Sequence, residues 1–218
     1  MKLNYKFKKI LVLLAILLTM GSVVGWLFAK GVHKFYAKKP LDYNQESQRL
    51  LNDHKYQEAA KLLEEGTKKY PKDSKLKTQL AQAYFDAKKY DEAIKEYEKV
   101  NQKEQNATSI NNLANVYRDK GDIAKAKELY QEAIKLDPKS SSPYLNLSSI
   151  LNAERNFSES ISLLEEGRKA QNSVSIIYAL ASTYIKNGDK TMAKNILKDW
   201  LANNPDDQQA KAILKGIK

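Results

Sequence analysis

The chain has 218 residues, room for one or two ordinary domains, and its apolar content of 42% is sufficient for a buried core. It has no cysteine, which excludes disulfides, thiol catalysis, cysteine-ligated metals and a lipid-modified cysteine anchor. The formal net charge is +11, but residues 1–39 hold eight lysines and no acidic residue, so the folded remainder has no clear basic cluster and we expect no nucleic-acid partner.

Residues 10–29 read ILVLLAILLTMGSVVGWLFA and contain no charged residue. A helix of about 20 residues spans about 30 Å, the hydrocarbon thickness of a bilayer. We therefore expect a single transmembrane signal-anchor helix here, with a basic tail over 1–9 and a basic juxtamembrane linker over 30–39. The alternative is a cleaved signal peptide, but cleavage after Gly25 would leave Trp26-Leu27-Phe28 at the start of the mature chain.

The orientation of this segment is less strongly determined, because lysines flank it on both sides. We expect the short N-terminal tail to stay in the cytoplasm and the rest of the chain to lie outside, since long C-terminal domains translocate largely regardless of charge. The lysines of 30–39 leave the reverse orientation open. Gly21 and Gly25 share one helix face, a small-residue spacing that would allow a homodimer to form in the membrane.

The rest of the chain repeats itself. Leu62-Leu63-Glu64-Glu65-Gly66 returns 101 residues later as Leu163-Leu164-Glu165-Glu166-Gly167, and related copies stand between and after them at intervals of 33 or 34 residues. Such a period is typical of stacked repeats, in which each unit buries its apolar face against its neighbours. Stacked repeats form long surfaces, which favours a function in binding other proteins.

Each unit has the pattern of two helices. In residues 112–138, apolar residues recur at spacings of three and four on either side of Lys120-Gly121-Asp122. Gly121 suits the left-handed position that ends a helix, and Asp137-Pro138 ends the unit because the residue before proline is pushed out of helical geometry. The pattern predicts a helical hairpin. Its residues are Leu113, Ala114, Tyr117, Gly121, Ala126, Tyr130, Ala133 and Pro138.

This set resembles the tetratricopeptide repeat (TPR) family, and the other units match it to differing degrees. The first is the weakest, since Glu46-Ser47 stands where a leucine and a small residue belong. The resemblance covers about residues 40–205 and implies an all-α fold, a TPR helical-hairpin solenoid. The transmembrane helix expected at 10–29 would precede this solenoid. Gln105 and Asn172 replace the terminal proline at the two spacings of 33, where we expect a locally altered stack. The five repeats are placed at 40–73, 74–106, 107–140, 141–173 and 174–205, and a capping helix at 206–218.

In that family the first helices of successive repeats line a concave groove, which implies a protein or extended peptide partner. Here carboxamides recur one residue before the leucine–small pair. A side-chain amide both donates and accepts, so a column of amides can pair with a peptide backbone, as some family members do. Solvated helix faces also carry Asn and Gln, and most tyrosines are expected in the core. The predicted groove residues are Gln45, Gln79, Gln82, Phe85, Asn111, Asn112, Asn115, Arg118 and Asn146.

No motif for catalysis, phosphate binding or metal binding is present, and His33 and His54 lack any such context. We expect no enzyme activity, no cofactor and no metal. The leading interpretation is a membrane-anchored scaffold or chaperone-like adaptor that binds partner peptides on the extracytoplasmic side. The alternative is a cytoplasm-facing scaffold subunit of a membrane complex.

Overall fold

The computed structural model describes residues 38–217. The predicted membrane segment 10–29, with Gly21 and Gly25, lies outside these residues. Within them the secondary structure is entirely α-helical, with 11 helices and no strand. None of these helices combines the length and the apolar character that a membrane span requires.

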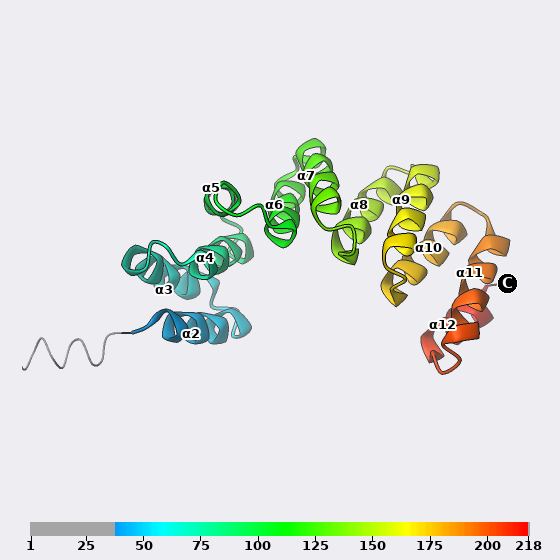
Figure 1. Cartoon of the computed structure of the whole chain (residues 1–218), viewed down its shortest axis with the longest axis horizontal. Helices are drawn as coiled ribbons and strands as arrows, with labels where there is room; N and C mark the ends of the chain where they lie inside the picture. Colours follow the sequence, from blue (N-terminus) through cyan, green and yellow to red (C-terminus); the bar gives the residue numbers. More distant parts are fainter. Residues whose placement is uncertain (1–37, 218) are drawn as a thin grey trace, which may run out of the picture. The chain divides into compact units, whose positions relative to one another are not determined.

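The helices follow one another along the chain as antiparallel pairs joined by short turns (Figure 1). A compact unit begins at Asn44, inside the first described helix, and α3 to α12 belong wholly to it. The helices are α2 (Pro40–Asn52), α3 (Tyr56–Lys69), α4 (Ser74–Asp86), α5 (Tyr90–Asn101), α6 (Ala107–Lys120), α7 (Ile123–Leu136), α8 (Ser141–Ala153), α9 (Phe157–Ala170), α10 (Val174–Lys186), α11 (Lys190–Asn203) and α12 (Gln208–Gly216).

Polar side chains begin several of the helices by accepting a backbone hydrogen bond that the first turn cannot satisfy itself. Asp73 accepts from the amide of Leu76 at 2.9 Å, and Asn106 accepts from Thr108 at the same distance. Asp122, Asp189 and Asp207 have the same role for α7, α11 and α12. The local sequence therefore fixes where these helices start.

The turn inside each helical pair contains one residue with positive φ. At Gly121, φ is 98°, and α6 ends at the preceding Lys120, which confirms the predicted turn. Gly188 occupies the corresponding turn between α10 and α11 with φ 87°. The other three turns use residues with a side chain, namely His54, Lys88 and Arg155.

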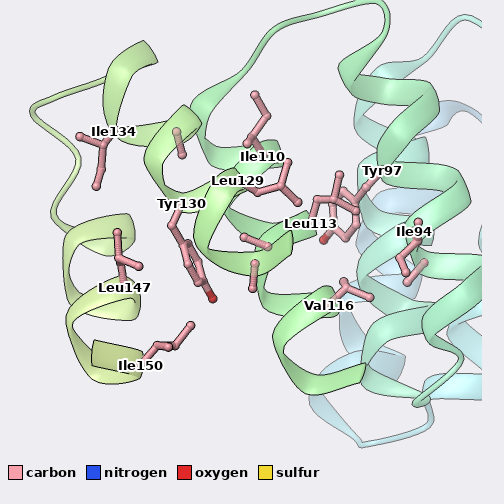
Figure 2. Close-up of a cluster of buried hydrophobic side chains, with 14 of the residues drawn as sticks. Ile94, Tyr97, Ile110, Leu113, Val116, Leu129, Tyr130, Ile134, Leu147 and Ile150 are labelled. Carbon is pink, nitrogen blue, oxygen red and sulfur yellow. The ribbon is translucent and has the colours of Figure 1, made fainter. Parts of the chain in front are cut away.

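The core consists of small residues that let helices approach and large residues that fill the remaining space. Ala81, Ala114 and Ala126 have no exposed surface, and neither do Tyr97 and Tyr130. Figure 2 shows side chains of α5, α6, α7 and α8 directed toward one another in this cluster. The prediction that these tyrosines belong to the core is confirmed.

Two hollows lie at the junctions where the repeat spacing is 33 residues. One, of about 360 Å³, lies among α5, α6 and α7 and is lined by Asn101 and Ile110, among others. The other, of about 160 Å³, is lined by residues of α9, α10 and α11 that include Ile177. A third hollow, of about 360 Å³, lies at the intervening junction, where the spacing is 34, and is lined by Arg118, Ile123 and residues of α8.

Candidate functional site

The first helices of successive pairs bring asparagines from two repeats into one network. Asn146 on α8 donates through Nδ2 to Oδ1 of Asn111 at 3.0 Å and to Oδ1 of Asn115 at 3.2 Å, both on α6. These three residues were predicted as groove residues, and the structure places them together. The network therefore links neighbouring repeats as well as presenting polar groups.

Tyrosines on the second helices of the pairs donate hydrogen bonds to these amide side chains. The hydroxyl of Tyr130 donates to Oδ1 of Asn115 at 2.6 Å, and the hydroxyl of Tyr97 donates to Oε1 of Gln82 at 3.0 Å. Burial is the main cause that raises the pKa of Tyr130 to about 12, so this hydroxyl remains a donor at neutral pH. Burial also raises the pKa of Tyr97, while a hydrogen bond with Asn112 opposes the rise.

This supporting role of the tyrosines is absent from the sequence prediction. The two pairs share a separation of 15 residues, Gln82 to Tyr97 and Asn115 to Tyr130. That recurring separation is a signal that sequence alone could have supplied. The pairing does not continue into the later repeats, because the positions that correspond to these tyrosines are Leu164 and Leu197.

The hydrogen bonds leave part of the network available to a guest. Asn115 uses its oxygen as an acceptor, which leaves its Nδ2 hydrogens to donate. Asn146 uses its Nδ2 as a donor, which leaves its oxygen to accept. A peptide backbone offers the matching carbonyl and N–H groups. Asn111, by contrast, is only 7% exposed, and its Nδ2 donates to Asn112, so its part in the network is internal.

Arg118 is the predicted cation of the groove, and its charge is already balanced. Its Nε donates to Oδ1 of Asp119 at 2.8 Å, and its Nη1 reaches Asn115 and the hydroxyl of Tyr130, each at 3.4 Å. The guanidinium is thus tied into the network. This part of the surface consequently offers amide groups more than net charge.

Toward α2 the face deepens into a polar hollow of about 550 Å³. Predicted residues Gln79 and Gln82 line it, and Oε1 of Gln79 is buried without a hydrogen-bond partner. Gln45 is exposed on α2 and is not among the lining residues. The lining residues are Gln48, Leu51, Asn52, His54, Tyr56, Gln79, Gln82 and Asp86.

Phe85, the remaining predicted residue, packs against the core. Its ring lies 6.2 Å from that of Tyr90 between centroids, and its side chain is partly buried. On α10, the amide column gives way to other residues, and Asn152 on α8 donates to Oγ1 of Thr183 at 2.9 Å. The amide-rich part of the face therefore belongs to α4, α6 and α8.

No group of three or more His, Asp or Glu side chains within residues 38–217 is arranged to hold a metal ion. The carboxylates that form ion pairs lie mainly on exposed helix surfaces. Glu128, for example, pairs with Lys125 at 2.8 Å. Such pairs contribute little to stability.

Three sequence models described as tetratricopeptide repeat match residues 50–115, 107–140 and 174–207, together more than half of the chain. The comparison with curated proteins gives no match.

Among solved structures, the chain is similar to the C-terminal part of a TPR repeat-containing protein from Cytophaga hutchinsonii, with a TM-score of 0.64 and 20% identity over 79% of this chain and 69% of that one. It is also similar to a thermophilic TPR protein from Thermus thermophilus, with a TM-score of 0.58 and 16% identity over 82% and 98% of the two chains. For MamA from Desulfovibrio magneticus RS-1 the TM-score is 0.60, with 16% identity over 79% and 98%. At these identities the likeness concerns the fold.

Proposed function

Because the chain belongs to the tetratricopeptide repeat family, whose fold serves protein–protein interaction, we propose that it is a membrane-anchored scaffold or chaperone-like adaptor that binds extended partner peptides along α4, α6 and α8. The observation that carries the proposal is the set of amide groups left over by the network. Asn115 retains a donor and Asn146 retains an acceptor on the same face. Such a face suits a peptide backbone of varied sequence.

A selection from a library of random peptides tests this proposal on the full chain in detergent. Asn112→Ala together with Asn146→Ala should weaken the binding of the selected peptides by roughly 1–3 kcal/mol, the cost of one or two lost hydrogen bonds. The matched control replaces two exposed amides elsewhere, Gln131 on α7 and Asn195 on α11, with alanine. Equal affinity in all three proteins, with unchanged helicity, would remove the proposal.

Residues 10–29 supply the proposed anchor, because an uncharged apolar run of this length matches the bilayer core. The full chain should remain with membranes during alkaline extraction, and its release would contradict the anchor.

If two copies pair through the helix face that carries Gly21 and Gly25, then Gly21→Leu with Gly25→Leu should lower the yield of chemically cross-linked dimer.

The extracytoplasmic placement of the repeats rests on the short lysine-rich tail, which resists translocation. Protease added to intact cells should then degrade the repeats. Full protection, with degradation after the cells are opened, would instead support a cytoplasm-facing scaffold. The lysines of 30–39 are the feature that favours this second arrangement.

A further inference from the structure

The hollow between α2 and α4 is acidic in a chain of high net positive charge. Asp86 is the only carboxylate among its lining residues, which include no lysine or arginine. His54 also lines it, and Nδ1 of His54 lies 2.6 Å from the hydroxyl of Tyr56 rather than on the carboxylate of Asp86. The hollow therefore contains a carboxylate without a counter-ion of its own.

The carboxylate of Asp86 is held in position by neighbours that are neutral. Nε2 of Gln82 donates to Oδ1 of Asp86 at 2.9 Å, and Tyr97 fixes Gln82 from the other side. Burial raises the pKa of Asp86, and the hydrogen bond from Gln82 opposes that rise. Asp86 forms no ion pair with the described residues. A partly buried carboxylate of this kind gains from an external cation.

The helix ends around the hollow add to its negative potential. α2 ends at Asn52 and α4 ends at Asp86, and both terminal residues line the hollow. The C-terminus of a helix carries a partial negative charge, which favours a cation and disfavours a carboxylate. Asp86 thus stands at an end of α4 where its own charge is unfavourable without a positive partner.

Two glutamines besides Asp86 line the same space. Gln79 contributes its side chain to the wall, with its Oε1 buried. Gln48 donates through Nε2 to Oδ1 of Asn52 at 3.1 Å, which leaves the oxygen of Gln48 to accept. A primary ammonium group has three donors and no acceptor, so it complements the Asp86 carboxylate and the amide oxygen of Gln48. Leu51 gives an apolar surface for the methylene chain of a lysine.

We propose that this hollow binds the side chain of a lysine carried by the partner peptide, an assignment that rests on the proposed function and adds a residue preference to it. The amides of α6 and α8 would pair with the backbone regardless of sequence. The lysine seated against Asp86 then sets the register of the peptide along the face.

The test titrates Nα-acetyl-lysine N-methylamide into the full chain in detergent and follows the side-chain amide signals of Gln79 and Gln82 by NMR. Saturable shifts are expected, and the probe acetylated at Nε should bind roughly tenfold more weakly or worse, because the charge is lost. Asp86→Asn should weaken the lysine probe to a similar extent. Alanine N-methylamide, which has a free α-amino group, should bind less tightly than the lysine probe.

Asp119→Asn is the matched control, since Asp119 occupies the corresponding position of the next repeat and is already paired with Arg118. It should leave the lysine probe unaffected. Absence of saturable shifts, equal binding by Asp86→Asn, or tighter binding of the α-amino probe would overturn the assignment. The peptide-library selection on the Asn112 and Asn146 variants reports separately on the proposed function.

Discussion

At the scale of single residues, the hairpin turns show where the chain departs from its family pattern. Gly121 and Gly188 adopt positive φ without penalty, while His54, Lys88 and Arg155 adopt it with a side chain. Positive φ costs a residue with a Cβ about 1–2 kcal/mol of folded-state free energy relative to glycine. Glycine has more conformational freedom in the unfolded chain, so its net advantage in stability is smaller than this.

Lys88→Gly should therefore raise the stability of the repeats by about 1 kcal/mol or less. Gly121→Ala should lower it by about 1 kcal/mol for conformational reasons alone, because a Cβ there would meet no atom within 4 Å. Urea unfolding followed by circular dichroism measures both. Shifts of the two midpoints in the same direction would contradict this account of the turns.

Asn101 gives a second prediction, because both polar atoms of its side chain are buried without a hydrogen-bond partner. The corresponding residue of the next pair is Ile134, which is buried. Asn101→Ile should remove the cost of desolvating the amide and raise stability by about 1–3 kcal/mol. Thermal unfolding is the measurement, with the exposed Gln131→Ile as control. A destabilised Asn101→Ile protein would show that the amide is satisfied in solution.

The tyrosines show how much of the candidate site the sequence could predict. Their helical spacing places Tyr97 and Tyr130 in the core, and the structure agrees. Their hydroxyl bonds to Gln82 and Asn115 join two different helices, so periodicity along one helix does not predict them. The burial of Asn111 also depends on contacts between helices. Its position in the repeat predicts a groove residue, but its side chain is buried.

At the scale of helices, the end of the solenoid depends on Asp207, which begins α12. Its carboxylate accepts from the hydroxyl of Tyr178 at 2.6 Å, from Nε1 of Trp200 at 2.7 Å and from the amide of Ala210 at 2.9 Å. These bonds, that from Tyr178 first, lower the pKa of Asp207. The carboxylate thus connects α10, α11 and α12.

Acid should loosen this capping helix. A carboxyl whose pKa is lower in the folded state stabilises the fold above its ordinary pKa of about 3.9, and this contribution is lost as the pH falls through the lower, folded value. With Trp26 replaced by phenylalanine, the fluorescence of Trp200 should change below about pH 4. Asp207→Asn should already show altered emission at neutral pH and lack that step. An identical acid transition in both proteins would rule out Asp207 as its origin.

The close approach of α9 to its neighbours depends on a glycine. A Cβ at Gly167 would lie 3.0 Å from side-chain atoms of both Ile176 and Tyr144, which are themselves buried. Gly167→Ala should therefore cost about 1–3 kcal/mol. Gly216→Ala, where nothing lies within 4 Å, should be neutral or slightly stabilising. Unfolding midpoints measure both changes, and equal effects would argue against tight packing at α9.

The helices themselves were largely predictable, since turn residues and helical periodicity mark each hairpin. The sequence also indicated the junctions at Gln105 and Asn172 as unusual, but hollows lie both there and at the intervening junction, so the altered stack stays a prediction. It could not predict their form. That form depends on side chains contributed by different helices, which periodicity along one helix does not place relative to one another.

At the scale of the whole molecule, fold and function have different foundations. The family matches and the solved structures establish a stack of helical hairpins, but identities of 16–20% do not identify a partner. The partner must be inferred from side chains on the exposed face. There the chain offers a neutral amide network on α6 and α8 beside an acidic hollow between α2 and α4.

The central claim is that these amides bind the backbone of a peptide, and backbone methylation tests it most directly. A peptide selected by the full chain is resynthesised with one N-methyl group at each position in turn. At one position, methylation should weaken binding to the natural protein by about 1 kcal/mol or more, because it removes the backbone N–H that donates to the side-chain oxygen of Asn146. The same methylation should have little effect on binding to the Asn146→Ala protein. Equal losses in both proteins, or tolerance of methylation at every position, would contradict backbone recognition by this face.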